Sequence, residues 1–544
     1  MSPAIAASAD ELCERHLRSG THLHVASTMS RPNALVRAVA RNFAGRARFT
    51  VSANAFHAGM HSLVMAGVVE RAITCFAGDT APVSRPNGLY RDITRGRPFA
   101  VEEWSLLSFL QRLIAGATGA PFAITTSLVG SDLDPAPERD GSARRIPALR
   151  PDVTLVHAHC ADARGNLYFS GPVGEGTWGA MAARRGVLAT VEQVRATAPP
   201  HAKCSVPADR VLGIAECPMG AHPQGMAAWP EIGFGGYVDD YPFLEELAAA
   251  CRAPQTARSW FGKWVKDIDD QRGYLDELGA GRVAGLISGL RAAPSAAVRP
   301  GGRASERERH VVLAARRIAR EVRDNGYRTL LAGIGVSHVA CWLAARMLKS
   351  EEIEVEVVNE LGMIGFLPHP GDTFLFSQRH VARCRAAAGT LEVLGQLVAG
   401  GARTLGVLSA AQVDQDGQIN TSRTPSGGFL VGSGGANDVA SHVRSVVVAA
   451  AAPDRYVPSV DFVTSPGRNV SCVVAEFGGF ERGADGAFRL SSWLPAEPGA
   501  DPRACVRDRT GWKPVVADDL VVEEPPSGRE LAVLRAIDVH GTYR

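Results

Sequence analysis

Short apolar runs alternate with longer amphipathic stretches along most of this 544-residue chain. In the second half such runs lie at residues 329–332, 352–358, 404–410 and 445–452, and amphipathic stretches separate several of them. The first half alternates in the same way from residue 21 onward. Strands that alternate with helices indicate a mostly parallel sheet whose two faces are covered by helices.

Three of the predicted helices have boundaries that can be tested. One begins at Ser305, where Glu308 three residues later completes a capping box. A second covers about residues 379–399. A third opens with the acidic residues of "EEW" at 102–104, whose negative charge suits the N-terminus of a helix.

Residues 291–305, "RAAPSAAVRPGGRAS", interrupt every periodic pattern of the chain. Two prolines, two adjacent glycines and several small residues are typical of a linker. We therefore predict a first domain at 1–290, a linker at 291–305 and a second domain at 306–544.

The two predicted domains share a short pattern, an apolar strand followed by Asp-x-x-Gly. It reads "PDVTLVHAHCADARGNLYF" in the first domain and "RTLGVLSAAQVDQDGQINT" in the second. Asp162 and Gly165 correspond to Asp414 and Gly417, and such a sequence favours a tight turn. Together with the linker, the repeat predicts two homologous α/β domains, each built on an open, mostly parallel sheet.

Composition excludes several classes of protein. Hydrophobic residues make up 46% and charged residues 21% of the chain, as in globular proteins. A net charge of +2 gives no electrostatic reason to expect a nucleic acid or an anionic membrane as partner. No apolar run approaches the roughly 20 residues of a membrane span. Ten cysteines without a C-x-x-C pair, and no apolar leader, indicate a cytoplasmic protein with reduced thiols.

No metal site is predicted. His157 and His159 lie on one face of a predicted strand and could form a ligand pair, but no third ligand accompanies them. Packed or hydrogen-bonded histidines are the better interpretation of this pattern.

Glu360 follows a predicted strand directly, in the turn Asn359-Glu360-Leu361-Gly362. In open parallel sheets, ligands bind beyond the carboxyl ends of the strands. A carboxylate at this position can act as a nucleophile, a general base or a metal ligand. From this stretch alone, a role as a helix cap or as the partner of an arginine is at least as well supported.

Two glycine-rich turns accompany Glu360 in the second half. Gly333 and Gly335 follow a strand and precede a helix, where backbone N–H groups can face a phosphate or acyl oxygen, or where glycine only allows close packing. Gly432, Gly434 and Gly435 precede another helix. Their amides could form an oxyanion hole, although a phosphate cradle or a packing turn is also open.

These stretches together resemble the family I coenzyme A transferases, in particular the glutaconate CoA-transferase-like branch, over most of the chain. The pair of "ExG" at Glu360 and "GxGGAND" at 432–438 is the most specific part of the resemblance. The other matching segments are "EEWSLLSFLQRLIAGATGAPF", "VTLVHAHCADARGN", "TVEQV", "PMGAHPQG", "LLAGIGVSHVA", "LSAAQVDQDGQINTS" and "DFVTSPGRNV".

The resemblance implies a fold, an architecture and a reaction. The fold is α/β, with two homologous open sheets of the coenzyme A transferase (NagB/RpiA-like) type, and the α-subunit-like and β-subunit-like parts are fused in one chain. The implied enzyme moves CoA from an acyl-CoA to a carboxylic acid by a ping-pong mechanism. Glu360 is the implied nucleophile and forms first an acyl-glutamyl anhydride and then a glutamyl-CoA thioester.

The resemblance also assigns roles to the glycine turns and to the partners. The residues implied to hold the oxyanion or CoA are Gly434, Gly435, Ala436, Asn437, Gly333 and Gly335. The CoA thioester is a substrate, no tightly bound cofactor is expected, and the chain is expected to form a homo-oligomer, either a dimer or a dimer of dimers.

The chain departs from the family pattern in two places. Loop 25–34, "VASTMSRPNA", lacks glycines that are frequent in the α part, and the "ExG" turn lacks the "ENG" of the 3-oxoacid transferases. A related group hydrolyses ring-derived CoA thioesters with a glutamate of the α part. A hydrolase or ring-opening hydrolase that uses Glu103, Glu360 or both therefore stays open, and a regulatory protein of the same fold is a third alternative.

The acyl group cannot be identified from the sequence. Four residues in predicted loops or at the ends of predicted elements could meet a second carboxylate of a substrate. They are Arg31, Ser127, Arg379 and Arg423, although an ordinary surface residue is the better interpretation of each.

Overall fold

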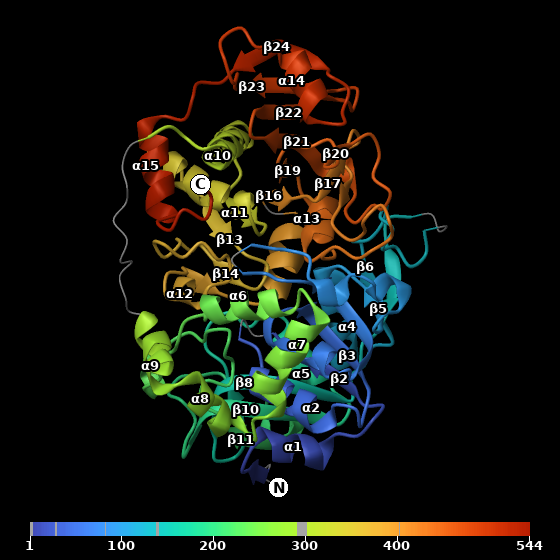
Figure 1. Ribbon diagram of the computed structural model, residues 1–544, viewed down its shortest axis with the longest axis vertical. Coiled ribbons are helices and arrows are strands. Elements are labelled where there is room, and N and C mark those ends of the chain that lie inside the picture. The colour runs from blue at the N-terminus through green and yellow to red at the C-terminus, as the bar shows by residue number, and fades with distance from the viewer. Residues whose placement is uncertain (1–3, 28–29, 82, 138–140, 291–301, 402) are drawn as a thin grey trace.

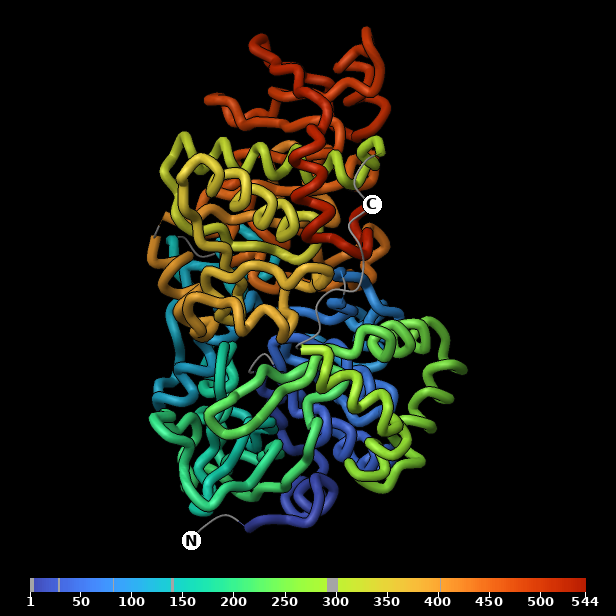
Figure 2. The backbone as a smooth tube through the Cα atoms, turned by 90° about the vertical axis from the view of Figure 1, so that its left-hand side faces the viewer, coloured from blue at the N-terminus to red at the C-terminus, as the bar shows by residue number. Residues whose placement is uncertain are grey.

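The computed structural model describes residues 4–27, 30–81, 83–137, 141–290, 302–401 and 403–544. The first half of the chain (blue to green) and the second half (yellow to red) form the two ends of an elongated molecule (Figure 1), and Figure 2 shows the same arrangement from the side. Each half is built around its own large sheet.

The first sheet has the strand order β1-β11-β10-β8-β2-β3-β4-β5, in which all described neighbours are parallel, and β9 adds to β8 in antiparallel orientation. Helices α1 and α2 cover one face and α5 the other. The strands are β1 Ala4–Ala6, β2 His22–Val25, β3 Phe49–Phe56, β4 Val69–Ala77, β5 Ala100–Glu103, β8 Val153–Asp162, β9 Leu167–Tyr168, β10 Gly186–Arg195 and β11 Val211–Glu216, and a separate hairpin contains β6 Phe122–Thr125 and β7 Arg144–Pro147. The helices are α1 Ala9–His16, α2 Asn33–Phe43, α3 His61–Met65, α4 Leu106–Ala117, α5 Gly176–Ala182, α6 Tyr241–Ala250, α7 Pro254–Phe261, α8 Gln271–Leu278 and α9 Ala280–Gly289.

The second sheet has the order β15-β14-β13-β12-β16-β19-β21-β22-β23-β24, and its central strands β13, β12, β16, β19 and β21 are parallel. The strands are β12 Thr329–Ala332, β13 Glu356–Val358, β14 Met363–Ile364, β15 Ala386–Ala387, β16 Thr404–Ser409, β19 Ser445–Val448, β21 Val470–Ala475, β22 Gly478–Arg482, β23 Phe488–Trp493 and β24 Val516–Val522, with β17 Gln412–Asp414, β18 Ile419–Asn420 and β20 Tyr456–Val457 in a small sheet beside it. The helices are α10 Glu306–Asn325, α11 Val336–Lys349, α12 Gln378–Val381, α13 Ala436–His442, α14 Pro502–Arg509 and α15 Gly528–Ile537.

The central parts of the two sheets have the same topology. The order β11-β10-β8-β2-β3 of the first sheet corresponds to β21-β19-β16-β12-β13 of the second, parallel throughout. Helix α2 connects β2 to β3, and α11 connects β12 to β13 in the same way. The α/β fold with two open, mostly parallel sheets is therefore as predicted.

The repeated Asp-x-x-Gly pattern forms the same hairpin in both halves. The N–H group of Gly165 donates to the carbonyl of Asp162, and that of Gly417 donates to the carbonyl of Asp414, each at 2.9 Å. Both glycines have positive φ, +92° and +75°. Each aspartate side chain also accepts backbone N–H groups of its own turn. These shared contacts support the interpretation of the halves as homologous.

Three predicted helix boundaries have different outcomes. The capping box at Ser305 and Glu308 is present and starts α10. The single helix over 379–399 is wrong, because the chain forms α12, then the edge strand β15, and then a π-helix at Leu391–Val398. The helix that opens at 102–104 is also wrong, because β5 runs to Glu103 and the N-cap of α4 is Ser105.

Most of the predicted linker, residues 291–301, lies outside the described residues, so the division at 291–305 stays a prediction. The two halves pack against each other. One hydrophobic cluster joins Phe109 and Leu113 of α4 to Leu394 and Val439 of the second half. In the described part of the chain, no helix has the length and apolar character that crossing a membrane requires.

Candidate active site

Glu360 lies in a tight turn between β13 and the antiparallel strand β14. Buried Asn359 fixes this turn, because its side-chain oxygen accepts hydrogen bonds from two backbone N–H groups of the turn, at 3.1 and 3.2 Å. Gly362 has a φ of +113°, and a Cβ there would lie 2.2 Å from the carbonyl oxygen of Ala388. The turn therefore requires glycine at 362 and gives Glu360 a defined position at the end of a strand.

The carboxylate of Glu360 is partly buried and faces the glycine-rich loop that precedes α13. The N–H group of Gly435 donates to Oε2 of Glu360 at 3.1 Å. Burial raises the pKa of Glu360 to about 7, the negative charge of Asp438 adds to the rise, and the hydrogen bond from Gly435 opposes it. A carboxylate with this pKa is ionised above neutral pH and is weakly solvated, and both properties suit a nucleophile.

The other amides of the glycine-rich loop have partners within the protein. The N–H of Gly434 donates to the carbonyl of Cys75 at 2.9 Å, and that of Ala436 donates to the carbonyl of Ser433 at 3.0 Å. The loop therefore does not offer three free N–H groups to an oxyanion, because two of the three already donate to carbonyl oxygens of the protein. Of the three predicted residues, only Gly435 directs its N–H at Glu360.

Asn437 and Asp438 connect the second half to the first. Asn437 is buried; its oxygen accepts from the N–H of Leu128 at 3.0 Å and its nitrogen donates to Ser131 at 3.1 Å. Asp438 accepts from the N–H of Leu107 at 2.8 Å, in the first turn of α4. Neither side chain is among the described residues that line a cavity at Glu360. Asn437 and Asp438 thus fix the loop against α4 and against the segment at 128–131 of the first half.

Gly333 and Gly335 lie between β12 and α11, at the carboxyl end of the central strand of the second sheet. The N–H of Gly333 donates to the carbonyl of Val407 at 2.9 Å, and that of Gly335 donates to Nδ1 of His338 at 2.9 Å. Both glycines line a cavity that reaches Glu360. They let the backbone lie close to whatever occupies this cavity, although their own N–H groups are engaged.

Glu103 is an interdomain ion-pair residue in this structure. One carboxylate oxygen accepts from Arg423 at 2.7 Å and the other from the hydroxyl of Ser422. Its side chain is 3% exposed, and it is not among the described residues that line the cavities at Glu360. In this structure the Glu103 carboxylate is thus engaged between the two halves, and its role as an alternative base stays a prediction.

The remaining candidates from the sequence also lie apart from Glu360. Ser127 is fully buried and lines neither cavity. His157 pairs with Glu192 at 2.8 Å, and His159 bonds the carbonyl of Ala227 at 3.1 Å. Within the described ranges, no cluster of three or more potential metal ligands is found.

Two cavities meet at Glu360, and Phe76, Ile334 and Gly434 also line both. The larger has a volume of about 420 Å³ and follows the carboxyl ends of β12 and β16, together with the glycine-rich loop. The smaller, about 70 Å³, lies between the two halves of the chain. A carboxylate at this junction can reach a group in either compartment.

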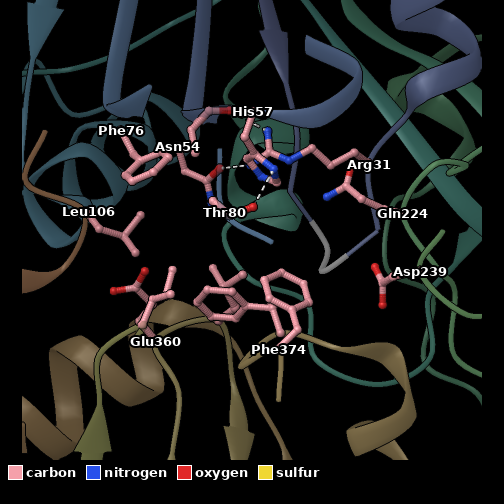
Figure 3. A pocket seen from close by; sticks show the side chains of 15 residues that line it. Arg31, Asn54, His57, Phe76, Thr80, Leu106, Gln224, Asp239, Glu360 and Phe374 are labelled. Carbon is pink, nitrogen blue, oxygen red and sulfur yellow. Dashed lines mark hydrogen bonds between the residues drawn. The ribbon is translucent and has the colours of Figure 1, made fainter. Parts of the chain in front are cut away.

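The smaller cavity contains polar residues that the sequence motifs did not point to. Figure 3 shows Asn54 and His57 on one side, beside Arg31, and Glu360 and Phe374 on the other. Asp239 lines the same cavity. Asn54 and His57 lie at the carboxyl end of β3, which corresponds in topology to the β13 end that carries Glu360. The rule that ligands bind at carboxyl ends of strands could have identified them.

Comparison with known proteins agrees with this architecture. Residues 6–211 match the family model described as coenzyme A transferase. One subunit of the 3-oxoadipate CoA-transferase of Pseudomonas knackmussii is 26% identical over 234 residues, 41% of this chain and 80% of that protein. One subunit of the glutaconate CoA-transferase of Acidaminococcus fermentans is 23% identical over 304 residues, 50% of this chain and 91% of that protein. The crystal structure of an acyl-CoA transferase of Escherichia coli O157:H7 superimposes with a TM-score of 0.67 at 16% identity, over 99% of this chain and 97% of that one.

Residues 6–211 are thus similar in sequence to the coenzyme A transferases, and the whole chain has the fold of a solved acyl-CoA transferase. The chain is accordingly an enzyme that transfers CoA, and it contains both α/β parts of the fold in one polypeptide. The resemblance deduced from the sequence motifs is confirmed.

Proposed function

We propose that this enzyme moves CoA between an acyl-CoA and a carboxylic acid by a ping-pong mechanism on Glu360. The observation that carries the proposal is the position of the Glu360 carboxylate at the junction of two cavities, held by the N–H of Gly435. In the proposed complex, the larger cavity takes the CoA arm, and the smaller one takes the acyl group.

The first half-reaction has two steps. Oε1 of Glu360, which Gly435 leaves free, attacks the thioester carbonyl; the C–S bond breaks and gives an acyl-glutamyl anhydride and the CoA thiolate. The thiolate then attacks the glutamyl carbonyl carbon, the anhydride C–O bond breaks, and the acid leaves as its carboxylate. The product is a glutamyl-CoA thioester, from which an acceptor carboxylate regenerates an acyl-CoA by the reverse sequence.

The site supplies three physical contributions to these steps. Partial burial removes water from the carboxylate and makes it a better nucleophile. The N–H of Gly435 lies against Oε2, so it can stabilise the negative charge that develops there when the thiolate attacks the glutamyl carbonyl. The apolar walls of the smaller cavity, including Phe76, Leu106 and Phe374, limit access of water to the anhydride.

The test is a transfer assay with and without an acceptor acid. Acceptor-dependent formation of a new acyl-CoA is expected, with little release of free CoA when no acceptor is present. A hydrolase would instead release CoA at the same rate without acceptor, and that result would contradict the proposal.

The Glu103→Gln variant separates the two candidate glutamates. It removes the buried charge that pairs with Arg423, so we expect the free energy of unfolding to fall by about 1–3 kcal/mol, while transfer by the folded enzyme changes less than about threefold. Thermal unfolding and initial rates measure the two effects. Loss of activity by about 100-fold or more without loss of folded protein would instead favour the Glu103 hydrolase.

The rate of the first half-reaction should depend on pH through Glu360. Since its pKa is raised to about 7 and only the ionised form attacks, kcat/KM for the acyl-CoA should fall about tenfold per pH unit below 7 and level off above it. Asp239 lines the same cavity, and burial raises its pKa to about 7 as well. Asp239→Asn is therefore the control: the same profile in this variant assigns it to Glu360, and a flat profile in the native enzyme contradicts the prediction.

The oligomeric state stays a prediction, because the structure contains a single chain. The relatives are subunits of CoA-transferases. We propose a homo-oligomer, in which the two cavities at Glu360 are lined by residues from both halves of the same chain.

A further inference from the structure

The site needs hydrogen-bond donors for two different oxyanions. When the CoA thiolate attacks the glutamyl carbon, negative charge develops on Oε2 of Glu360, and the N–H of Gly435 lies 3.1 Å from this atom. When Glu360 attacks the thioester, the charge develops instead on the carbonyl oxygen of the acyl group. The N–H groups of Gly434 and Ala436 already donate to carbonyl oxygens of the protein. The acyl oxyanion therefore needs a donor from another part of the cavity wall.

Asn54 is a buried amide in the wall of the smaller cavity. It lies near the carboxyl end of β3 and is 5% exposed. Its side-chain oxygen accepts a hydrogen bond from an Nη of Arg31, which is itself buried. Because a guanidinium group has donors only, the amide atom that faces it has to be the oxygen, and the nitrogen lies on the other side. Arg31 thus fixes the orientation of the Asn54 amide.

The side-chain nitrogen of Asn54 is a donor without a partner. No described residue accepts a hydrogen bond from Nδ2, and this atom is not one of the fully buried polar atoms that lack a partner, so it is open to the cavity. Figure 3 shows the amide across the cavity from Glu360 and Leu106. A donor on a side chain this deeply buried costs free energy while it is unpaired, and a bound acceptor oxygen offsets that cost. Asn54 therefore presents a hydrogen-bond donor to whatever lies in front of Glu360.

The two halves of the chain place Asn54 and Glu360 at equivalent strand ends. Strands β3 and β13 correspond in the order of the two sheets. Asn54 lies two residues before the end of β3, and Glu360 lies two residues after the end of β13. Both residues line the smaller cavity, so the carboxyl ends of these strands meet there from opposite halves. A polar group from each half is thus available to one ligand between them.

The donors beside Asn54 in the cavity wall are bonded to one another or to Asn54 itself. Nδ1 of His57 lies 3.2 Å from the hydroxyl of Thr80. One Nη of Arg31 donates to the carbonyl of Ala55 at 2.9 Å, and the other donates to Asn54. The positive charge of Arg31 draws electron density from the amide oxygen, and this polarisation makes the N–H groups of the amide stronger donors. Arg31 therefore acts on the site through Asn54.

We propose that Asn54 is a catalytic residue, whose Nδ2–H donates to the carbonyl oxygen of the acyl group while Glu360 attacks the acyl carbon. No proton is transferred: Oε1 of Glu360 bonds to the carbon, the carbonyl electron pair moves to the oxygen, and it returns when the C–S bond breaks. Asn54 then stabilises the oxyanion on the acyl carbon, Gly435 stabilises the one on the glutamyl carbon, and Arg31 is a positioning residue. The role of Asn54 rests on the proposed transfer reaction and adds a residue to it.

The Asn54→Asp variant tests the proposal directly, because it keeps the shape of the side chain and removes its N–H donors. The carboxylate of the variant pairs with the buried guanidinium group of Arg31, so the temperature of thermal unfolding should stay the same or rise. In contrast, kcat for CoA transfer should fall about 100- to 1000-fold. KM for the acyl-CoA should change less than about threefold, because the lost hydrogen bond acts mainly in the transition state. A purely structural asparagine would not lose activity while the fold is kept or stabilised.

A second variant and a pH profile separate a missing donor from an added charge. If the carboxylate of Asn54→Asp acted only by raising the pKa of Glu360 above about 7, the loss of kcat would shrink as the pH rises to 9. Loss of a donor instead persists at pH 9. Asn54→Leu adds no charge, so its kcat should fall by a similar factor, while its unfolding temperature falls because Arg31 loses an acceptor. Recovery of Asn54→Asp at pH 9, or a kcat of Asn54→Leu within about threefold of the native value, overturns the inference.

A matched control is Gln224→Glu. Gln224 is also a buried amide of the smaller cavity, and its oxygen accepts from Asn33 at 3.0 Å, but Figure 3 shows it beyond the guanidinium group of Arg31 as seen from Glu360. The change replaces an amide with a carboxylate in the same cavity and leaves Asn54 in place. We expect kcat to fall less than about threefold. Equal losses in the two variants would overturn the role of Asn54 and make the polarity of the cavity as a whole responsible.

Failure of this role and failure of the proposed function give different results. Transfer at the native rate by Asn54→Asp overturns the role of Asn54 and leaves the transfer reaction on Glu360 intact. If the native enzyme transfers CoA to no acid, the proposed function fails, and the role of Asn54 fails with it.

Discussion

Replacing Glu360 with alanine or glutamine is expected to lower CoA transfer by about 10³-fold or more, because both variants remove the nucleophile on which the anhydride and the thioester form. Glutamine is the sharper change, since it keeps the shape of the side chain that contacts Gly435. Initial rates of acyl-CoA formation measure the effect.

Covalent labelling tests the same prediction independently of rate. Incubation of the native enzyme with an acyl-CoA and no acceptor should attach CoA to the peptide that contains Glu360, detectable by mass spectrometry of the digested protein. Glu360→Gln should show no such adduct. An adduct on another residue, or full transfer activity in Glu360→Gln, would rule out the proposed mechanism.

The Glu360 variants should also be more stable than the native enzyme at high pH. A carboxyl group whose pKa is raised on folding binds more protons in the folded state, so ionising it destabilises the fold as pH rises from about 4.5 to about 7. Above this window, Glu360→Gln should gain up to about 3 kcal/mol in the free energy of unfolding. At pH 4, below both pKa values, the gain should nearly vanish, which separates lost chemistry from lost structure.

The second large effect is expected for Gly435→Ala, with a loss of transfer of about 100-fold. A Cβ at this position would lie 2.2 Å from Oε2 of Glu360. The backbone of Gly435, at φ −86° and ψ 0°, is a conformation that alanine adopts, so the effect comes from the displaced carboxylate. Steady-state kinetics and thermal unfolding measure the loss of activity and of stability.

Gly434→Ala is the matched control for this prediction. A Cβ at Gly434 has no described atom within 4 Å, although its φ of +50° costs alanine about 1 kcal/mol. We expect this variant to lose some stability and to keep transfer within about tenfold of the native enzyme. Equal losses in the two variants would show that the loop as a whole, and not the contact with Glu360, sets the rate.

A double-mutant cycle isolates the contact itself. In Glu360→Ala the carboxylate is absent, so adding Gly435→Ala should cost little further stability. In the native background the same change should cost about 1–3 kcal/mol, because the added methyl group overpacks the turn. Additive effects in the cycle would contradict the steric explanation.

The motif around these glycines serves stability as well as chemistry. Gly435 contacts Glu360, whereas Asn437 and Asp438 bond to residues 105–131 of the first half. Substitution of Asn437 or Asp438 should therefore weaken the packing between the two halves, and it should affect substrate binding only indirectly. The sequence could not show which residues of the motif serve the interface, since the hydrogen-bond partners of Asn437 and Asp438 lie more than 300 residues away along the chain.

Local patterns were sufficient for much of the fold. Alternating strands and helices, the capping box at Ser305, and the two Asp-x-x-Gly turns depend on contacts between near neighbours, so the sequence predicted them correctly. The position of Glu360 on a glycine-containing turn at a strand end belongs to the same group. Its proposed role as nucleophile came from the family resemblance and awaits the tests above.

Long-range contacts account for the predictions that were wrong. The stretch 379–399 has helical periodicity, but Ala386–Ala387 pair with β14, and this pairing breaks the helix. The acidic charge of Glu103 fits a helix N-terminus, whereas pairing of β5 with β4 extends the strand to Glu103. Strand pairing between distant segments outweighed local propensity in both cases.

The sequence by itself determined that this is a two-part α/β protein with a carboxylate at a strand end, because periodicity, turns and caps are encoded by neighbouring residues. Only the tertiary structure decided what surrounds that carboxylate. The pKa of Glu360, the amide of Gly435 that faces it, the two cavities and the buried Arg31 all arise where segments from both halves meet. Burial and charge at such a junction depend on distances between residues far apart in the chain, and these distances exist only in the folded molecule.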